Sequence, residues 1–235
     1  MDSISDDSSS WISSCFKTEE TFSFSKLRTE SSQRDYFRFN FQGKTFILMY
    51  APKGIDESIE SFCKKADVFK SFQVKVPEIY FRNDDLCHLI IEDFSDNLYQ
   101  LNITQENSDI FIKSALDQLI RIQNIDCDTE IFDYFDLEKS IANKDLFIDF
   151  FCRGYLNLSD SSIPFDTINE GYNFILKRFY ELPQCISHYD FETRNLIYLD
   201  SKETGVLDFQ DAMIAPYALD LASIFKDLYM VWDKK

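Results

Sequence analysis

Apolar and polar side chains follow two different periods along the chain, and the change between them divides the chain into two parts. Alternating or continuous apolar runs, which are typical of β-strands, lie at residues 21–27, 35–41, 45–50, 76–81 and 87–92. Gly43 and its neighbours separate the second run from the third and form a hairpin-turn signal. We therefore predict five strands, of which at least the first three are antiparallel.

Apolar residues at helical spacing occur once among the strands and dominate after residue 105. Residues 56–71 place Ile59, Phe62 and Phe69 on one face, with Asp56 as a candidate N-cap. Further helices are predicted near 10–16 and at 106–125, 136–156, 166–182 (capped by Asp166 or Thr167) and 217–229. The aromatic stretch 147–155 within the second of the long helices is expected to belong to the core. The pattern predicts an α+β fold with a small antiparallel sheet and one helix first, and a mainly helical part after it.

The residues with the clearest chemical meaning lie between the last two predicted helices. His188, Asp190 and Asn195 form an H-x-D-x-x-x-x-N pattern, and a strand, a turn and a second apolar run then lead to Asp208-Phe-Gln. This order of loop, strand, turn, strand and Asp-Phe is typical of the active site of protein-kinase-like phosphotransferases. It predicts a two-lobed fold in which residues 1–10 are a flexible tail, 11–93 form the nucleotide-binding small lobe and 94–235 form the catalytic large lobe.

Phosphoryl transfer requires positioning and charge neutralisation, and the motif supplies groups for both. Asp190 is expected to accept the hydrogen bond of the attacking hydroxyl and orient it. Asn195 and Asp208 carry hard oxygen donors that suit Mg²⁺ and would bind the metal together with ATP. His188 is expected to pack under the loop and to bond to the backbone. Asp220 is expected to be a buried carboxylate that caps N–H groups of the same loop.

The nucleotide site is less clearly marked. The loop between the first two strands would lie over the ATP phosphates, where Ser31, Ser32 and Arg34 could bind them or could form an ordinary surface hairpin. Met49 occupies the position in the third strand where protein kinases carry a lysine. Glu92 and Phe94 lie in the expected hinge, whose backbone would hold the adenine.

The roles of three further charged residues are open to more than one interpretation. Arg194 could reach the transferred phosphate or could be a surface arginine of the loop. Glu57 and Glu60 stand where the usual partner of the strand lysine would lie, and without that lysine we expect both to be solvated.

Composition narrows the class of partner and the compartment. The 235 residues contain 45% hydrophobic residues, enough for a sizeable core, and carry a formal net charge of −17. That charge argues against a nucleic-acid partner. The six cysteines form no C-x-x-C pair, so we expect free and mostly buried thiols in a reducing cytoplasm. The N-terminus has no signal-peptide pattern, no apolar run approaches the ~18 residues of a membrane span, and no membrane partner is expected.

Several segments resemble one family in particular, the aminoglycoside phosphotransferase-like enzymes with the protein-kinase fold. The segments SSQRDYFRF, ILMYAP, LIIEDFSD, HYDFETRNLIYL and GVLDFQDAM are similar to those of its bacterial anomeric kinases of N-acetylmuramate and N-acetylglucosamine. The resemblance runs from about Trp11 to Trp232. It implies that Met49 is normal for the family, that Asp190 is the catalytic base, and that Asn195 and Asp208 bind Mg²⁺. His-Tyr-Asp replaces the family's His-Arg-Asp.

The resemblance implies an ATP-dependent sugar kinase that phosphorylates the C1 hydroxyl of an amino sugar in cell-wall recycling. Members of the family continue with further helices beyond the last motif, so the large lobe is expected to be truncated here. Two alternatives stay open. One is a kinase of an antibiotic, choline-like or other metabolite hydroxyl. The other is a non-catalytic, pseudokinase-like nucleotide-binding module, which the missing strand lysine favours and the intact Asp190, Asn195 and Asp208 oppose.

Overall fold

The computed structural model of the chain describes residues 5–27, 33–54, 58–126, 128, 130–136, 141 and 144–227. The predictions for Ser31, Ser32, Asp56 and Glu57 lie outside these residues.

The first part of the fold contains the elements α1 (Asp6–Phe16), β1 (Ser25–Lys26), β2 (Asp35–Phe41), β3 (Lys44–Tyr50), α2 (Ile59–Ser71), β4 (Ile79–Asn83) and β5 (His88–Glu92). The second part contains α3 (Tyr99–Asn102), α4 (Ser108–Gln123), η1 (Phe147–Tyr155), η2 (Asp160–Ser162), α6 (Phe165–Glu181), β6 (Gln184–Ser187), η3 (Thr193–Asn195), β7 (Leu196–Tyr198), β8 (Thr204–Val206), η4 (Phe209–Asp211), β9 (Met213–Pro216) and α7 (Ala218–Phe225).

The first part is built on a five-stranded antiparallel sheet with the order β1-β2-β3-β5-β4. The turn between β2 and β3 has positive φ at Gln42 (50°) and Gly43 (79°), as a two-residue hairpin turn matched to the strand twist requires. The five predicted strands are confirmed, but the first is much shorter than expected. Residues 21–24 are not strand, and Phe22 and Phe24 instead pack against Phe39 of β2.

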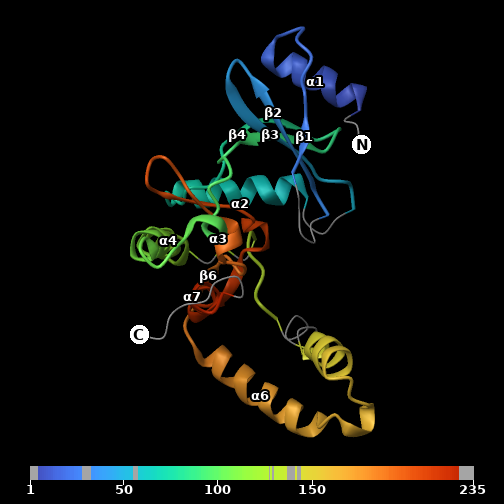
Figure 1. Cartoon of the computed structure of the whole chain (residues 1–235), viewed down its shortest axis with the longest axis vertical. Helices are drawn as coiled ribbons and strands as arrows, with labels where there is room; N and C mark the ends of the chain where they lie inside the picture. Colours follow the sequence, from blue (N-terminus) through green and yellow to red (C-terminus); the bar gives the residue numbers. More distant parts are fainter. Residues whose placement is uncertain are drawn as a thin grey trace.

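Alternation along the strands directs side chains to two separate apolar layers. On one face, Phe46 and Leu48 of β3 join an aromatic cluster with Ile12 of α1. On the other face, Ile47 and Met49 belong to the main core, which α2 covers. The sheet therefore lies between the two helices, with α1 above it and α2 below it in Figure 1.

The flexible tail expected at residues 1–10 is instead helical from Asp6 onward, where helix α1 begins. The Ser5 side chain accepts a hydrogen bond from the Ser8 N–H as the N-cap of this helix. Ser8 is buried, and its Oγ lies 2.9 Å from Nε2 of His88 in β5. Residues 6–10 are thus fixed to the sheet, because α1 has an apolar face and a buried polar anchor.

Helices α2 and α6 begin in different ways. Ser58 caps α2, and its Oγ accepts a hydrogen bond from the Ser61 N–H at 3.1 Å. Helix α6 begins directly after Pro164 without a side-chain cap, which makes the predicted capping role of Asp166 or Thr167 wrong. Proline suits a helix start because its fixed φ and missing N–H cost nothing there.

The second part continues the main core under α2. Phe111, Ala115 and Leu119 of α4 are buried in the same cluster as Phe209 and Ile224. Two short strand pairs, β6 with β9 and β7 with β8, complete this part, and Phe209 in the turn after β8 packs on Phe62 and Phe69 of α2. No helix among the described residues is both long and apolar enough to cross a membrane.

The aromatic stretch 147–155 is not core, contrary to the prediction. Ile148 and Cys152 are buried in a small satellite cluster, but Phe150 is 72% exposed and Tyr155 is 79% exposed. This π-helical segment and α6 lie at the end of the molecule farthest from α1 (Figure 1). No disulfide joins the five described cysteines; Cys63 and Cys152 are buried and the other three are partly exposed, so the thiols are less buried than expected.

Candidate active site

The loop that carries the motif leaves β6 at Ser187 and is held from below by Asp220 of α7. The Asp220 carboxylate accepts hydrogen bonds from Ser187 Oγ (2.9 Å), the His188 N–H (2.7 Å) and the Tyr189 N–H (3.0 Å). Asp220 is 1% exposed, and burial raises its pKa. The predicted capping role of Asp220 is confirmed. Tyr189 has a φ of 78°, a costly conformation for this residue type, and these three bonds stabilise it.

His188 also has the structural role that its pattern predicted. Its ring is buried, and Nε2 lies 2.8 Å from the backbone carbonyl of Leu207. The ring also meets Phe191 in an edge-on contact at 5.7 Å. His188 thus connects the motif loop to the residue before Asp208.

The hairpin β7–β8 brings Asn195 and Asp208 to adjacent positions. Leu196 pairs with Val206 in this hairpin, and the Leu207 N–H donates to the Asn195 carbonyl at 2.9 Å. The Asn195 amide nitrogen donates to the Asp190 carbonyl at 2.9 Å, which leaves the amide oxygen as the atom that can accept or ligate. The two side chains therefore belong to one site together with Asp190.

The donor set fits Mg²⁺. Among the described residues, no group of three or more His, Cys, Asp or Glu side chains could hold a metal. Mg²⁺ does not need one, because it is usually bound by one or two protein oxygens, with phosphates and water in the other positions. Asp208 has the left-handed backbone (φ 59°), and its Oδ1 accepts from Gln210 Nε2 at 2.5 Å.

Asp190 is half-buried, and burial raises the pKa of its carboxyl. The nearby His188 and Arg194 lower that pKa, whereas Asp208 and Asp211 raise it. A carboxylate whose charged form is poorly solvated accepts a hydrogen bond or a proton more readily, as the base of a hydroxyl transfer must.

Arg194 forms an ion pair with Glu192, with Nε 2.9 Å from Oε2. Burial raises the pKa of Glu192, and Arg194 opposes this shift. The structure thus places Arg194 beside the loop carboxylates, and its contact with a transferred phosphate stays a prediction. A further hydrogen bond holds the loop, because the Thr193 N–H donates to the Asp227 carboxylate at 2.7 Å.

Of the residues predicted to bind the nucleotide, Arg34 is buried and lies over the Phe62 ring of α2 at 5.8 Å. Phe62 in turn packs on Phe209 at 4.8 Å, so Arg34 lies on the same side of α2 as the Asp208 turn. Met49 is fully buried in the main core. On the outer surface of α2, Glu60 pairs with Lys64, which confirms that Glu60 is solvated.

The predicted hinge is a tightly packed segment. Glu92 accepts from the Glu78 N–H at 3.2 Å and pairs with Lys75 at 3.3 Å. Phe94 is 6% exposed. A Cβ atom added to Gly205 would lie only 2.6 Å from the Phe94 ring. Gly205 is therefore required by this contact between hinge and hairpin.

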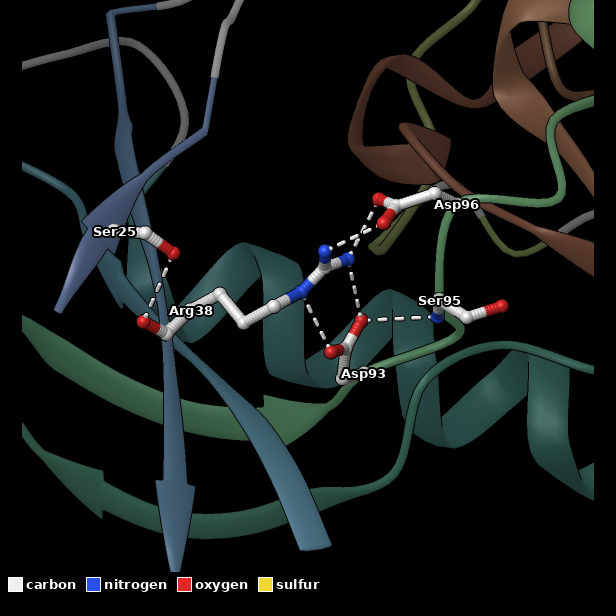
Figure 2. Close-up of polar contacts among 5 residues, drawn as sticks. All are labelled: Ser25, Arg38, Asp93, Ser95 and Asp96. Atoms are coloured by element: carbon white, nitrogen blue, oxygen red, sulfur yellow. Dashed lines mark hydrogen bonds and ion pairs between the residues drawn. The ribbon is translucent and has the colours of Figure 1, made fainter. Parts of the chain in front are cut away.

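Arg38 lies on β2 and binds two carboxylates of the predicted hinge segment, Asp93 and Asp96 (Figure 2). Its Nη1 and Nη2 contact both carboxylate oxygens of Asp96 at 2.7 and 2.8 Å. Its Nε and Nη2 contact Asp93 at 2.7 and 3.0 Å, and Asp93 also accepts from the Ser95 N–H at 2.9 Å. We call these residues the hinge clasp. Sequence reasoning missed Arg38; its signal was an arginine on the polar side of an alternating strand, opposite an acidic segment.

Comparisons with known proteins agree with this arrangement. Residues 23–235 match the family model described as "Phosphotransferase enzyme family". A protein of Pseudomonas putida named N-acetylmuramate/N-acetylglucosamine kinase is 27% identical over 212 residues, which are 89% of this chain and 61% of that protein. A protein of the same name from Neisseria meningitidis is 25% identical over 230 residues, covering 96% and 67%. The chain thus spans about three fifths to two thirds of the length of these relatives.

Solved structures show the same fold at lower identity. A choline kinase from Streptococcus pneumoniae has a TM-score of 0.66 and 15% identity, over 92% of this chain and 72% of the other. An ADP-bound aminoglycoside phosphotransferase has a TM-score of 0.62 and 18% identity, over 91% and 73%. The predicted two-lobed, protein-kinase-like α+β fold is confirmed.

Proposed function

Because the chain belongs to the phosphotransferase enzyme family, we propose that it acts as an ATP-dependent kinase of a small-molecule hydroxyl. The observation that carries this proposal is the constrained Asp190 loop with Asn195 and Asp208 beside it. The acceptor that we propose is the anomeric hydroxyl of N-acetylmuramate or N-acetylglucosamine. This choice rests on the names of the sequence relatives and on the motifs that resemble theirs.

In the proposed reaction, Asp190 orients the sugar hydroxyl and takes its proton. The sugar oxygen forms a bond to the γ-phosphorus of ATP, the bond from that phosphorus to the β–γ bridging oxygen breaks, and ADP leaves. Asn195 and Asp208 would hold Mg²⁺, which when bound neutralises phosphate charge. We propose Arg34 as the cation on the phosphate loop, since Met49 offers none.

The nucleotide would lie between the small lobe (residues 11–93) and the large lobe (94–235). Its adenine would lie against the segment from Glu92 to Phe94. The hinge clasp fixes the backbone there, so this segment is ordered before the nucleotide binds.

The test is phosphate transfer from Mg²⁺-ATP, followed by ³¹P NMR, with N-acetylmuramate, N-acetylglucosamine, choline and an aminoglycoside as acceptors. We expect an anomeric phosphate signal with an amino sugar. Asp190→Asn should lower the rate by about 10²–10⁴-fold, the usual contribution of a positioned general base. Asp200→Asn, an exposed carboxylate in the β7–β8 turn, is the matched control and should leave the rate unchanged.

Other outcomes would redirect the assignment. Product with choline or the aminoglycoside alone would refute the amino-sugar acceptor and keep the kinase. ADP binding without product from any of these acceptors would support a non-catalytic nucleotide-binding module.

A further inference from the structure

A buried lysine on α2 lies directly against the turn that carries Asp208. Lys65 is only 8% exposed, although its neighbour Lys64 has a side chain that is 58% exposed and paired with Glu60. Lys65 follows Phe62 by three residues and precedes Phe69 by four, so it lies on the apolar face of the helix. A lysine at such a position is rare, because burying an ammonium group is costly unless it has partners.

The contacts of Lys65 explain its burial. Its Nζ donates to the backbone carbonyl of Gln210 and lies 6.0 Å from the centre of the Phe132 ring. On either side of it, Phe62 and Phe69 pack on Phe209 at 4.8 and 5.5 Å. Helix α2 thus holds the turn with two aromatic contacts and one charged hydrogen bond between them.

A residue of the same turn also holds the Asp208 carboxylate, which belongs to the candidate metal site. The Gln210 side chain donates to Asp208 Oδ1 at 2.5 Å, while the Gln210 carbonyl accepts from Lys65. Gln210 is therefore fixed at its backbone by α2 and in turn fixes the orientation of Asp208. Asp208 has a left-handed backbone (φ 59°), which aspartate adopts more readily than most residues, and the Gln210 bond fixes its carboxylate in this conformation.

We propose that Lys65 is a positioning residue for the metal ligand Asp208 and acts through Gln210. The inference rests on the proposed function and deepens it. In this site α2 supplies a cation to the metal turn, whereas β3 places the apolar Met49 in the core. Movement of α2 would move the Asp208 carboxylate with it. The position of this helix would therefore decide whether Asp208 is oriented to bind the metal.

The first test is hydrogen exchange on the nucleotide-free protein. In Lys65→Met, the amides of residues 208–212 should exchange faster, whereas those of the motif loop at 188–195, which Asp220 holds, should not change. Lys64→Met is the matched control, one residue away on the same helix, and should leave both segments unchanged. Equal exchange of residues 208–212 in Lys65→Met and the unmodified protein would overturn the proposal.

The second test is calorimetry of ADP binding with Mg²⁺ and with EDTA. Loss of a group that orients a metal ligand typically costs about 10–100-fold in metal affinity. Lys65→Met should therefore lower the Mg²⁺-dependent gain in ADP affinity by about tenfold or more, and leave the affinity in EDTA within about twofold. Lys65→Arg, which keeps the charge, should recover part of the gain. Gln210→Met removes the donor to Asp208 and should reproduce the loss even if Lys65→Met does not fold.

The outcomes separate the two proposals. If the unmodified protein binds no ADP under either condition, the proposed function fails, and the exchange experiment alone decides the role of Lys65. If Lys65→Met weakens ADP binding equally in Mg²⁺ and EDTA, Lys65 contacts the nucleotide or supports the whole fold, and the positioning role is refuted.

Discussion

The hinge clasp gives a sharp prediction, because one arginine is bound by two carboxylates with very different burial. Arg38 makes two contacts with each of Asp93 and Asp96. The Asp93 side chain is 4% exposed, whereas the Asp96 side chain is 77% exposed. We therefore expect Asp93→Ala and Asp96→Ala to have unequal effects on the free energy of unfolding, despite the similar geometry of the two pairs.

The magnitudes follow from the environment of each carboxylate. Asp93 also accepts from the Ser95 N–H, and its removal would leave the partly buried Arg38 with one solvent-exposed partner. Breaking a fully buried pair costs about 3–5 kcal/mol, and since the Arg38 side chain is 22% exposed, we expect about 2–4 kcal/mol. Exposed pairs contribute about 0–1 kcal/mol and are screened by salt. Asp96→Ala should therefore cost less than about 1 kcal/mol.

The assay is urea unfolding of the two variants and the unmodified protein, at low and high salt, followed by circular dichroism. The lower stability of Asp93→Ala should persist in high salt, and the smaller effect of Asp96→Ala should disappear. The reasoning is refuted if the two variants lose equal stability, or if Asp96→Ala is the more destabilised. Calorimetry of ADP binding then shows whether the clasp also positions the hinge, in which case Asp93→Ala binds ADP more weakly.

Two further predictions concern the hairpin and the motif loop. Gly205→Ala would place a Cβ 2.6–2.7 Å from the Phe94 ring, and such overpacking should cost about 1–3 kcal/mol in urea unfolding. Burial raises the pKa of Asp190 and Arg194 lowers it, so the acid limb of kcat/KM should lie above the ordinary aspartate value. Because the base must be ionised, Arg194→Gln should move this limb to still higher pH.

Each of these predictions has a control. Phe94→Leu in the Gly205→Ala background should recover part of the lost stability, since it removes ring atoms from the contact; no recovery would contradict the proposed clash. For the pH profile, Arg178→Gln removes a mainly exposed arginine of α6 and should leave the acid limb in place. A limb that moves to lower pH in Arg194→Gln would show that Arg194 does not stabilise the charged form of Asp190.

Local patterns predicted the parts of the fold whose partners are close in sequence. Gly43 marked the β2–β3 hairpin, and the run from Asn195 to Asp208 marked the β7–β8 hairpin, because both turns join neighbouring strands. The pairing of β6 with β9 was not predicted. Its four-residue strands join residues 184–187 to 213–216, and nothing in so short a run distinguishes strand from loop.

Burial was predicted less well than periodicity. The residues of 147–155 have a helical apolar pattern, and Ile148 and Cys152 are buried as that pattern requires. Phe147, Phe151 and Tyr155 stack on one another along the helix but stay exposed, because α6 and η1 lie away from the main core (Figure 1). Hydrophobic composition indicates that a residue favours burial, but the topology decides whether a covering surface exists.

The distribution of positive charge bears on how a chain with a net charge of −17 would accommodate the proposed nucleotide site. Arg38 and Arg194 are each bound to carboxylates, so they position the hinge and the motif loop while adding little net positive charge to the site. Lys65 donates to the Gln210 carbonyl and so places its Nζ beside the Asp208 turn. If Arg34 contacts the phosphates, the two cations flank Phe62 on one face of α2. Arg34, just before β2, and Lys65 of α2 would then supply the electrostatic support that Met49 of β3 does not.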